Sequence, residues 1–263
     1  MPFAEVNDAR LFYTDEGEGP PVLLVHGWSC DGSDWAWQIP ALKAAGYRCI
    51  APDLRGHGRS SVPAGGYTPK QYAADLAALA GQLGCGPLVA LGHSMGGAAV
   101  VALAVEHPEA VRAVVPIDSA YGFDPGTLLA FAPMIEAFRS PAGHAAALQF
   151  AANAFYSPAT PAHLPPLHAR RIAAFDQQVM AAAMEALASP ESFGERPAAE
   201  AYLGESRRRR SRSARAGTIP LQSPPGSARS SSTRSRRRWD GKAPGIGSTR
   251  SGRRSSTASS WSG

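Results

Sequence analysis

Short apolar runs rich in Val, Leu and Ile alternate with Ala-rich stretches of helical character over the first 118 residues. Each run lacks the in-and-out alternation of a half-exposed strand, as expected for strands that are buried on both faces. This order predicts a largely parallel sheet covered by helices on both sides. The predicted strands are Pro21–Val25, Arg48–Ala51, Pro87–Leu91 and Val111–Ile117, and the predicted helices are Trp35–Ala45, Pro69–Leu83 and Gly96–His107.

Two further segments flank this alternation. The pair Asn7–Asp8, which tolerates tight-turn geometry, separates Phe3–Val6 from Arg10–Tyr13, so we expect an antiparallel hairpin at the start of the chain. After Asp118, Ala-rich segments interrupted by frequent prolines predict several short helices and no strands. The expected organisation is therefore an α/β core over residues 1–120 and an inserted helical lid over residues 121–203.

The net charge of +5 conceals two regions of opposite charge. Residues 206–263 contain 15 Lys and Arg side chains and one acid, so the preceding 205 residues are acidic overall. The basic segment is also rich in Ser and nearly free of aliphatic residues, so it cannot offset the entropy cost of becoming ordered. We predict a disordered Arg- and Ser-rich tail over residues 204–263, preceded by a region with enough apolar residues to bury a core.

The sequence shows no clear pattern for a membrane span, a secretory leader or a disulfide framework. No apolar run reaches the roughly 18 residues of a membrane span, and residues 1–13 lack the pattern of a secretory leader. The cysteines Cys30, Cys49 and Cys85 are odd in number and show no metal-ligand spacing, so we interpret them as reduced thiols. These features predict a cytoplasmic protein with no membrane partner and no metal site.

The strongest chemical signal lies in Gly92–Gly96, which reads Gly-His-Ser-Met-Gly. It follows one predicted strand and precedes a predicted helix, the context that the nucleophile elbow Gly-x-Ser-x-Gly requires. Small residues at 92 and 96 permit a sharp turn, which would lift the Ser94 hydroxyl out of the sheet beside the free N–H groups of the helix start. Ser94 is therefore the predicted nucleophile.

A second segment, His26-Gly27-Trp28, closes the first central strand. The backbone N–H groups of Trp28 and Met95 would together form an oxyanion hole. We interpret His26 as a loop histidine that bonds nearby backbone, and Asp53–Ser60 as a structural turn beneath the site. Aromatic side chains are candidates for an apolar substrate pocket, with Trp28 and Trp35 the foremost, followed by Trp37, Phe131, Phe138, Phe150, Phe155 and Tyr156.

These three segments stand in the order and spacing of the α/β-hydrolase superfamily. The chain resembles the branch of small bacterial esterases, haloperoxidase-like perhydrolases and carbon–carbon bond hydrolases, closely over Phe3–Asp118 and loosely over the lid. The resemblance implies an α/β-hydrolase fold in which Ser94 hydrolyses an ester or related acyl bond of a small, mainly apolar substrate, with no metal or organic cofactor. A serine at the elbow separates the chain from the dehalogenases and epoxide hydrolases of this fold, which carry Asp there.

The pattern of the family breaks after the lid. The resemblance places the catalytic base in a histidine after the last strand, yet all seven histidines precede Arg170, and the last two strands are missing. A serine without a base is a poor nucleophile, so we expect an impaired hydrolase whose exposed sheet edge favours aggregation. Asp118, at the end of its predicted strand, is the candidate catalytic acid, and a substitute base is left open among the lid histidines His144, His163 and His168.

One hypothesis for this break is a shift of the reading frame near Gly204–Arg207. Read two nucleotides later, the codons of residues 239–257 can encode a segment containing Gly-His-Trp, and those of residues 206–220 can encode a strand followed by an acid-bearing loop. Both segments resemble the family's missing parts and occur in one frame and in the right order. On this hypothesis the tail is the product of a frameshift.

Two alternative functions stay open. The segment His26–Ser29 also resembles the cofactor-free ring-cleaving dioxygenases of the superfamily, which use a His–Asp pair. A noncatalytic role, in which the basic tail binds polyanions through counterion release, is the second. We expect no specific nucleic-acid partner, because only Trp239 and Trp261 interrupt the charged tail with an aromatic surface. The substrate and the oligomeric state are not set by the sequence.

Overall fold

The computed structural model describes residues 2–204, in which six strands form one sheet. The strands lie in the order β1-β2-β4-β3-β5-β6. Their bounds are β1 Phe3–Val6, β2 Ala9–Glu16, β3 Pro21–Val25, β4 Arg48–Pro52, β5 Leu88–His93 and β6 Val111–Ile117. Apart from Gly204, the last described residue, the predicted disordered tail over residues 204–263 and the frameshift near Gly204–Arg207 lie outside the described part of the chain.

The sheet is antiparallel at its start and parallel through its centre. Strands β1 and β2 form the expected hairpin, with Phe3 opposite Phe12, and Asn7 takes a φ of 50° in the turn between them. Strand β2 pairs antiparallel with β4, whereas β4, β3, β5 and β6 run parallel to one another. This arrangement confirms the predicted α/β fold class.

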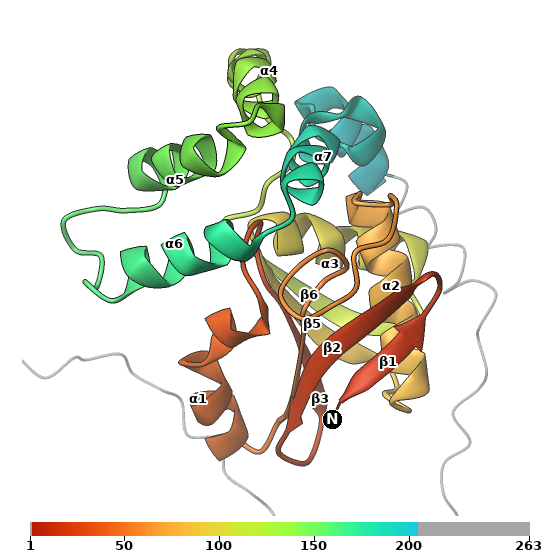
Figure 1. Ribbon diagram of the computed structural model, residues 1–263. Helices are drawn as coiled ribbons and strands as arrows, with labels where there is room; N and C mark the ends of the chain where they lie inside the picture. The colour runs from red at the N-terminus through yellow and green to blue at the C-terminus, as the bar shows by residue number, and fades with distance from the viewer. Residues whose placement is uncertain (1, 205–263) are drawn as a thin grey trace, which may run out of the picture. The chain divides into compact units, whose positions relative to one another are not determined.

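Helices cover both faces of the sheet (Figure 1). On one face, α2 (Pro69–Gln82) and α3 (Met95–Glu106) enclose the larger core, to which β3 contributes Leu23 and Val25. On the other face, α1 (Gln38–Ala44) and a 3-10 turn, Gly32–Trp35, pack Trp35 and Ile39 against Val22 and Leu24 of the same strand. Because successive β3 residues face opposite cores, the continuous apolar run of this strand is explained.

The predicted helix Trp35–Ala45 is wrong at its beginning. The chain instead forms the 3-10 turn, capped by the Asp31 side chain, and starts α1 only at Gln38. Pro40 explains the break, because a helix beginning at Trp35 would place this residue in its interior, where the missing N–H removes a hydrogen bond and the ring clashes with the preceding turn. Starting at Gln38 puts Pro40 in the first turn, where its N–H is not needed.

The prediction that Val111–Ile117 is buried on both faces is also wrong. Only Val111 of β6 is buried, and Val115 and Ile117 are 43% and 39% exposed. The physical reason is position: β6 is the last strand of the sheet, and among residues 2–204 no strand pairs with its outer edge. The apolar sequence of β6 is typical of a central strand, but β6 is an edge strand of the described sheet.

Residues after β6 are helical, and we keep the name lid for residues 121–203. The helices are α4 Pro125–Arg139, α5 Gly143–Ala154, α6 Leu164–Ala174 and α7 Gln177–Ala188, followed by a 3-10 turn at Pro190–Ser192 and a helical stretch over residues 196–204. Side chains of Asp124 and Asp176 cap α4 and α7 by accepting backbone N–H bonds. Across the described helices, none combines the length and apolarity that crossing a membrane demands.

Candidate active site

Ser94 sits at the bend between β5 and α3. Its backbone has φ 52° and ψ −116°, a conformation that costs a non-glycine residue of order 1–3 kcal/mol. The Ser94 N–H donates to the Ile117 carbonyl at 3.0 Å, and the Ala120 N–H donates to the Ser94 carbonyl at 3.1 Å. Backbone bonds to the end of β6 and the segment after it therefore hold the strained conformation in place.

Two glycines make the bend sterically possible. A Cβ on Gly92 would meet the backbone of Gly96 and Gly97, and a Cβ on Gly96 would meet the carbonyl oxygens of Val25 and His26. Only a residue without a side chain fits where helix α3 approaches strand β3 this closely. The structure thus gives the physical reason for small residues on either side of Ser94.

The two backbone N–H groups expected to form an oxyanion hole are uncommitted. Among the hydrogen bonds of residues 2–204, neither the Trp28 nor the Met95 N–H is a donor. The segment that carries Trp28 lies against the bend, since a Cβ on Gly27 would be 3.4 Å from the Ser94 Cβ. Met95 is the first residue of α3, where helix N–H groups are free and the helix dipole is positive. Two N–H groups without a partner among residues 2–204 therefore lie in segments that adjoin Ser94.

A cavity of about 960 Å³ opens beside Ser94. It brings together residues of the segment after β3, of β5, of the end of β6 and of the lid, including Asp118, His163 and His168. Its aromatic lining comprises Trp28, Trp35, Trp37 and Phe155. A mainly apolar wall with a few polar groups is typical of a small-molecule site.

The two foremost aromatic candidates differ in their surroundings. The Trp28 indole is stacked on Phe138 at 5.3 Å and donates from Nε1 to the Met180 carbonyl at 3.0 Å, so it ties the core to the lid. The buried Nε1 of Trp35 has no hydrogen-bond partner among the described residues. Of the lid aromatics considered from sequence, Phe155 borders the cavity, whereas Phe131, Phe138, Phe150 and Tyr156 are not among its lining residues.

The polar segments interpreted as structural make structural contacts. His26 Nδ1 donates to the Gly27 carbonyl at 2.8 Å while its Nε2 accepts from the Leu54 N–H at 2.9 Å, so both ring nitrogens are engaged. Asp53 is buried and accepts from the Gly32 N–H at 2.8 Å. The buried Arg55 pairs with Asp75 at 2.6 Å. These contacts fasten the loops beneath the cavity.

The groups for acid–base chemistry are not assembled in the same way. Within the described residues, Ser94 Oγ makes no hydrogen bond with any histidine, and the exposed Asp118 carboxylate makes no hydrogen bond at all. His144 Nε2 donates to the Phe175 carbonyl at 2.9 Å, away from the cavity lining. His163 and His168 border the cavity, and burial lowers the pKa of His168.

Sequence reasoning missed one cluster in the same cavity. Candidate ligand atoms of Cys30, Asp34 and His168 all lie within 4.8 Å of one another. Burial, reinforced by Asp34, raises the pKa of the Cys30 thiol well above its ordinary value, so the free side chain is no ready thiolate nucleophile. No linear spacing reveals this cluster, because His168 reaches it only through the folding of the lid.

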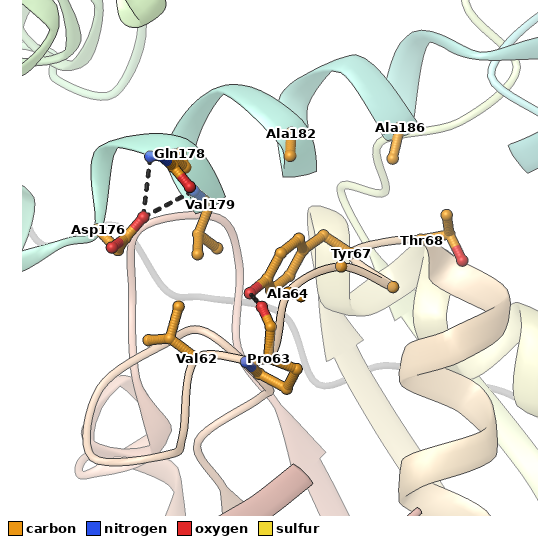
Figure 2. Close-up of a pocket in the computed structure, with 12 residues that line it drawn as sticks. Val62, Pro63, Ala64, Tyr67, Thr68, Asp176, Gln178, Val179, Ala182 and Ala186 are labelled. Carbon is orange, nitrogen blue, oxygen red and sulfur yellow. Dashed lines mark hydrogen bonds between the residues drawn. The ribbon is translucent and has the colours of Figure 1, made fainter. Parts of the chain in front are cut away.

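A second cleft, of about 450 Å³, lies between the loop Val62–Thr68 and helix α7 (Figure 2). Figure 2 shows the Asp176 carboxylate capping α7 through the N–H groups of Gln178 and Val179, and the Tyr67 hydroxyl bonded to the Pro63 carbonyl. Its polar groups serve local structure, and no serine, cysteine or histidine of the described residues lines it. The cavity beside Ser94 is therefore the candidate active site.

A serine forced into a left-handed backbone conformation between a parallel strand and a helix is characteristic of α/β hydrolases. A family model described as the alpha/beta hydrolase fold matches residues 20–217, and the chain belongs to this family. This assignment confirms the family resemblance drawn from the motifs.

Individual relatives share part of their length with the chain. It is 43% identical to a non-heme haloperoxidase of Rhodococcus erythropolis over 108 residues, 41% of this chain and 39% of that protein. It is 40% identical to an epoxide hydrolase of Caballeronia sordidicola over 110 residues, 41% of this chain and 33% of that protein. The chain therefore matches well under half the length of these curated relatives.

Solved structures match over a greater share. The enol-lactonase of Burkholderia xenovorans LB400 is 27% identical with a TM-score of 0.63, covering 74% of this chain and 78% of that one. A bromoperoxidase of Bacillus anthracis gives 26% identity and the same TM-score and coverage. An esterase of Exiguobacterium antarcticum, 22% identical with a TM-score of 0.65 over 76% of this chain and 85% of that one, shares the fold.

Proposed function

We propose that this chain is a serine hydrolase acting on an ester or related acyl bond of a small, mainly apolar substrate. Ser94 is the nucleophile, and the N–H groups of Trp28 and Met95 are the oxyanion donors. The observation that carries the proposal is the strained Ser94 backbone at the edge of an apolar cavity, near two N–H groups that have no hydrogen-bond partner among residues 2–204. No metal or organic cofactor enters the proposed reaction.

The proposed chemistry follows the usual two stages of acyl transfer. Ser94 Oγ loses its proton to a base and bonds to the substrate carbonyl carbon, whose oxygen becomes an anion facing the two N–H donors. The carbonyl re-forms as the alcohol departs with a proton, leaving an acyl group on Ser94. Water then adds in the same way and releases the acid, which restores the serine.

The cavity wall supports a small apolar substrate. Trp35, Trp37 and Phe155 offer aromatic surface, and the cavity volume of about 960 Å³ is ample for a compact molecule. The enol-lactonase similarity supports acyl-bond chemistry in particular, since a lactone is a cyclic ester. The dioxygenase alternative gains no support from His26, whose two ring nitrogens are both occupied by backbone groups.

The proposed site lacks a base in contact with Ser94 among residues 2–204. Asp118 borders the cavity and remains our candidate acid, but among residues 2–204 no histidine links it to Ser94. In the sequence as printed, no histidine follows His168. We therefore propose that proton removal from Ser94 limits turnover, and that the residual rate comes from the oxyanion donors and substrate binding, which in serine proteases leave about 10³–10⁴-fold acceleration over water.

Chemical rescue with imidazole tests both parts of the proposal. The full chain is assayed with p-nitrophenyl butyrate over a range of imidazole concentrations. We expect slow hydrolysis that rises with imidazole, because a diffusible base can enter the cavity and accept the Ser94 proton. Ser94→Ala should lose this increment and retain only the background reaction of imidazole with the ester.

Ser119→Ala is the matched control for that experiment. Ser119 follows β6 near the bend, and its buried Oγ has no hydrogen-bond partner in the described part of the chain, so its removal should leave the rate and the fold intact. Equal imidazole increments in the wild type and Ser94→Ala would refute Ser94 as nucleophile. Fast turnover without imidazole that is lost in His163→Gln or His168→Gln would refute the claim that the chain has no histidine acting as the base.

A further inference from the structure

We propose that Cys30, Asp34 and His168 form a binding site for a divalent transition-metal ion such as Zn²⁺, in the cavity that Ser94 borders. Their candidate ligand atoms lie within 4.8 Å of one another, and all three residues are half-buried. Cys30 follows β3, Asp34 belongs to the 3-10 turn, and His168 comes from α6 of the lid. The site thus draws on two segments that are far apart in sequence.

The chemistry of the three donors selects the kind of ion. A thiolate, an imidazole nitrogen and a carboxylate oxygen form the borderline-soft set that suits Zn²⁺ and Co²⁺, whereas Mg²⁺ and Ca²⁺ prefer oxygen ligands alone. Zinc–ligand bonds of about 2.0–2.3 Å in a tetrahedral site place ligand atoms roughly 3.3–3.8 Å apart. Side-chain rotations that close the present separations by about 1 Å would satisfy this geometry.

Contacts around the cluster already orient two of the ligands. The Tyr156 hydroxyl lies 3.2 Å from His168 Nδ1 and the two rings stack, which leaves Nε2 of His168 as the ligand atom. Arg171 pairs with Oδ1 of Asp34 and leaves the second carboxylate oxygen available. A partner on the other ring nitrogen of a ligating histidine is the usual outer contact of a metal site.

The charges balance when the ion binds. The Cys30 thiol gives up its proton to solvent as the sulfur–metal bond forms, so one thiolate, one carboxylate and a neutral imidazole match the two positive charges of the ion. The Arg171 charge is balanced separately by Asp31, whose carboxylate lies 3.0 Å from the Arg171 Nε. Three protein ligands leave a fourth position open, as in catalytic rather than structural zinc sites.

Cobalt titration of the full-length chain tests the site directly, because Co²⁺ bound to a thiolate gives a near-ultraviolet charge-transfer band. We expect one equivalent of Co²⁺ to produce this band, and Zn²⁺ to displace it. Cys30→Ser should abolish the band, and His168→Gln should weaken Co²⁺ binding. Tyr156→Phe, which removes only the outer contact, should weaken binding by about 10-fold.

Matched variants separate this site from other metal-binding groups. Cys85→Ser removes a thiol outside the cluster, and His163→Gln removes another histidine of the cavity lining, so both should keep the wild-type band and affinity. Residues after Arg170 contain no cysteine or histidine to compete. Ser94→Ala should also bind Co²⁺ normally, so failure of the proposed hydrolase function would leave this result unaffected.

Circular dichroism of each variant shows whether it is folded. Absence of the charge-transfer band in the folded wild type would overturn the proposal, as would a band that persists in folded Cys30→Ser. If Cys30→Ser does not fold, His168→Gln against His163→Gln decides: equal affinity for Co²⁺ in these two variants would overturn it, and selective loss in His168→Gln would support it.

Discussion

Ser94 lies between two contrasting neighbours. On one side, β5 and α3 form a packed unit in which every residue from Met95 to Val105 is buried. On the other side, β6 is largely exposed and is followed by Asp118, whose carboxylate has no hydrogen-bond partner in the described part of the chain. The difference teaches that the proposed nucleophile is positioned by the strand–turn–helix segment of β5 and α3, together with two backbone hydrogen bonds to the end of β6 and the residues after it. The acid–base groups of such a site depend instead on structure beyond β6.

A substitution that disrupts the packed unit of β5 and α3 should have the largest effect on stability and on activity. Gly92→Ala places a Cβ against the backbone of Gly96 and should destabilise the protein by about 1–3 kcal/mol. It should also abolish imidazole-rescued hydrolysis, because the bend that aims Ser94 must open. Gly81→Ala is the control, since a Cβ there meets no atom within 4 Å and an alanine favours the helix. Urea denaturation of both variants measures the difference, and equal stabilities would contradict the close-packed bend.

The packed interior also contains a histidine that resists protonation. Burial, with a smaller effect of His26, lowers the pKa of His57 to about 3. Below pH 6.5 the unfolded chain therefore binds a proton that the folded chain does not, and stability should fall by up to about 1.4 kcal/mol per pH unit toward pH 3. Urea unfolding at several pH values should give a shallower decline for His57→Phe. An unchanged decline would show that His57 does not carry this effect.

Because β6 is exposed, we expect molecules to associate through it. A substitution on β6 should change stability less than one in the packed unit. Val115 lies on β6, whose outer edge pairs with no strand among residues 2–204, and is 43% exposed. A lysine there should reduce pairing of edges between molecules, because charge on an edge strand opposes such contact. Light scattering of Val115→Lys should show less aggregation than the wild type, with stability changed by less than about 0.5 kcal/mol. Equal aggregation of Val115→Lys and the wild type would mean that the molecules do not associate through the β6 edge.

The smallest expected effect on the rate of hydrolysis belongs to Asp118. Where a carboxylate orients a catalytic histidine, Asp→Asn costs about 10⁴-fold in turnover. No histidine contacts Asp118 among the described residues, so Asp118→Asn should change the imidazole-rescued rate by less than about 10-fold, or 1.4 kcal/mol. A loss near 10⁴-fold would mean that Asp118 works with a base in this chain.

The fold could be predicted from sequence wherever the deciding interactions are local. The bend at Ser94 follows from two glycines and a serine within five residues, and the hairpin follows from the turn at Asn7. The helix predicted from Trp35 begins only at Gln38, because Pro40 is accommodated in the first turn of a helix and not in its interior. Exposure of Val115 could not be predicted, because its strand carries a central-strand sequence and burial depends on whether another strand pairs with it.

The residues of the candidate site also differ in whether local sequence predicts them. The proposed roles of Ser94, Trp28 and Met95 follow from short motifs at the ends of strands. The grouping of Cys30 and Asp34 with His168 could not be found that way, because the lid must fold over the core before the histidine reaches the other two. Contacts made by distant segments leave no periodic or motif signal in a single sequence.

The most direct test of the central claim is to locate the site of phosphonylation. The full-length chain is incubated with a fluorophosphonate, digested, and analysed by peptide mass spectrometry beside Ser94→Ala and Ser119→Ala. If the bend exposes Ser94 to the cavity and its oxyanion donors, a single adduct should form slowly on Ser94, persist in Ser119→Ala and vanish in Ser94→Ala. An adduct on other serines instead, or no adduct on Ser94 in a chain shown to be folded, would contradict the claim.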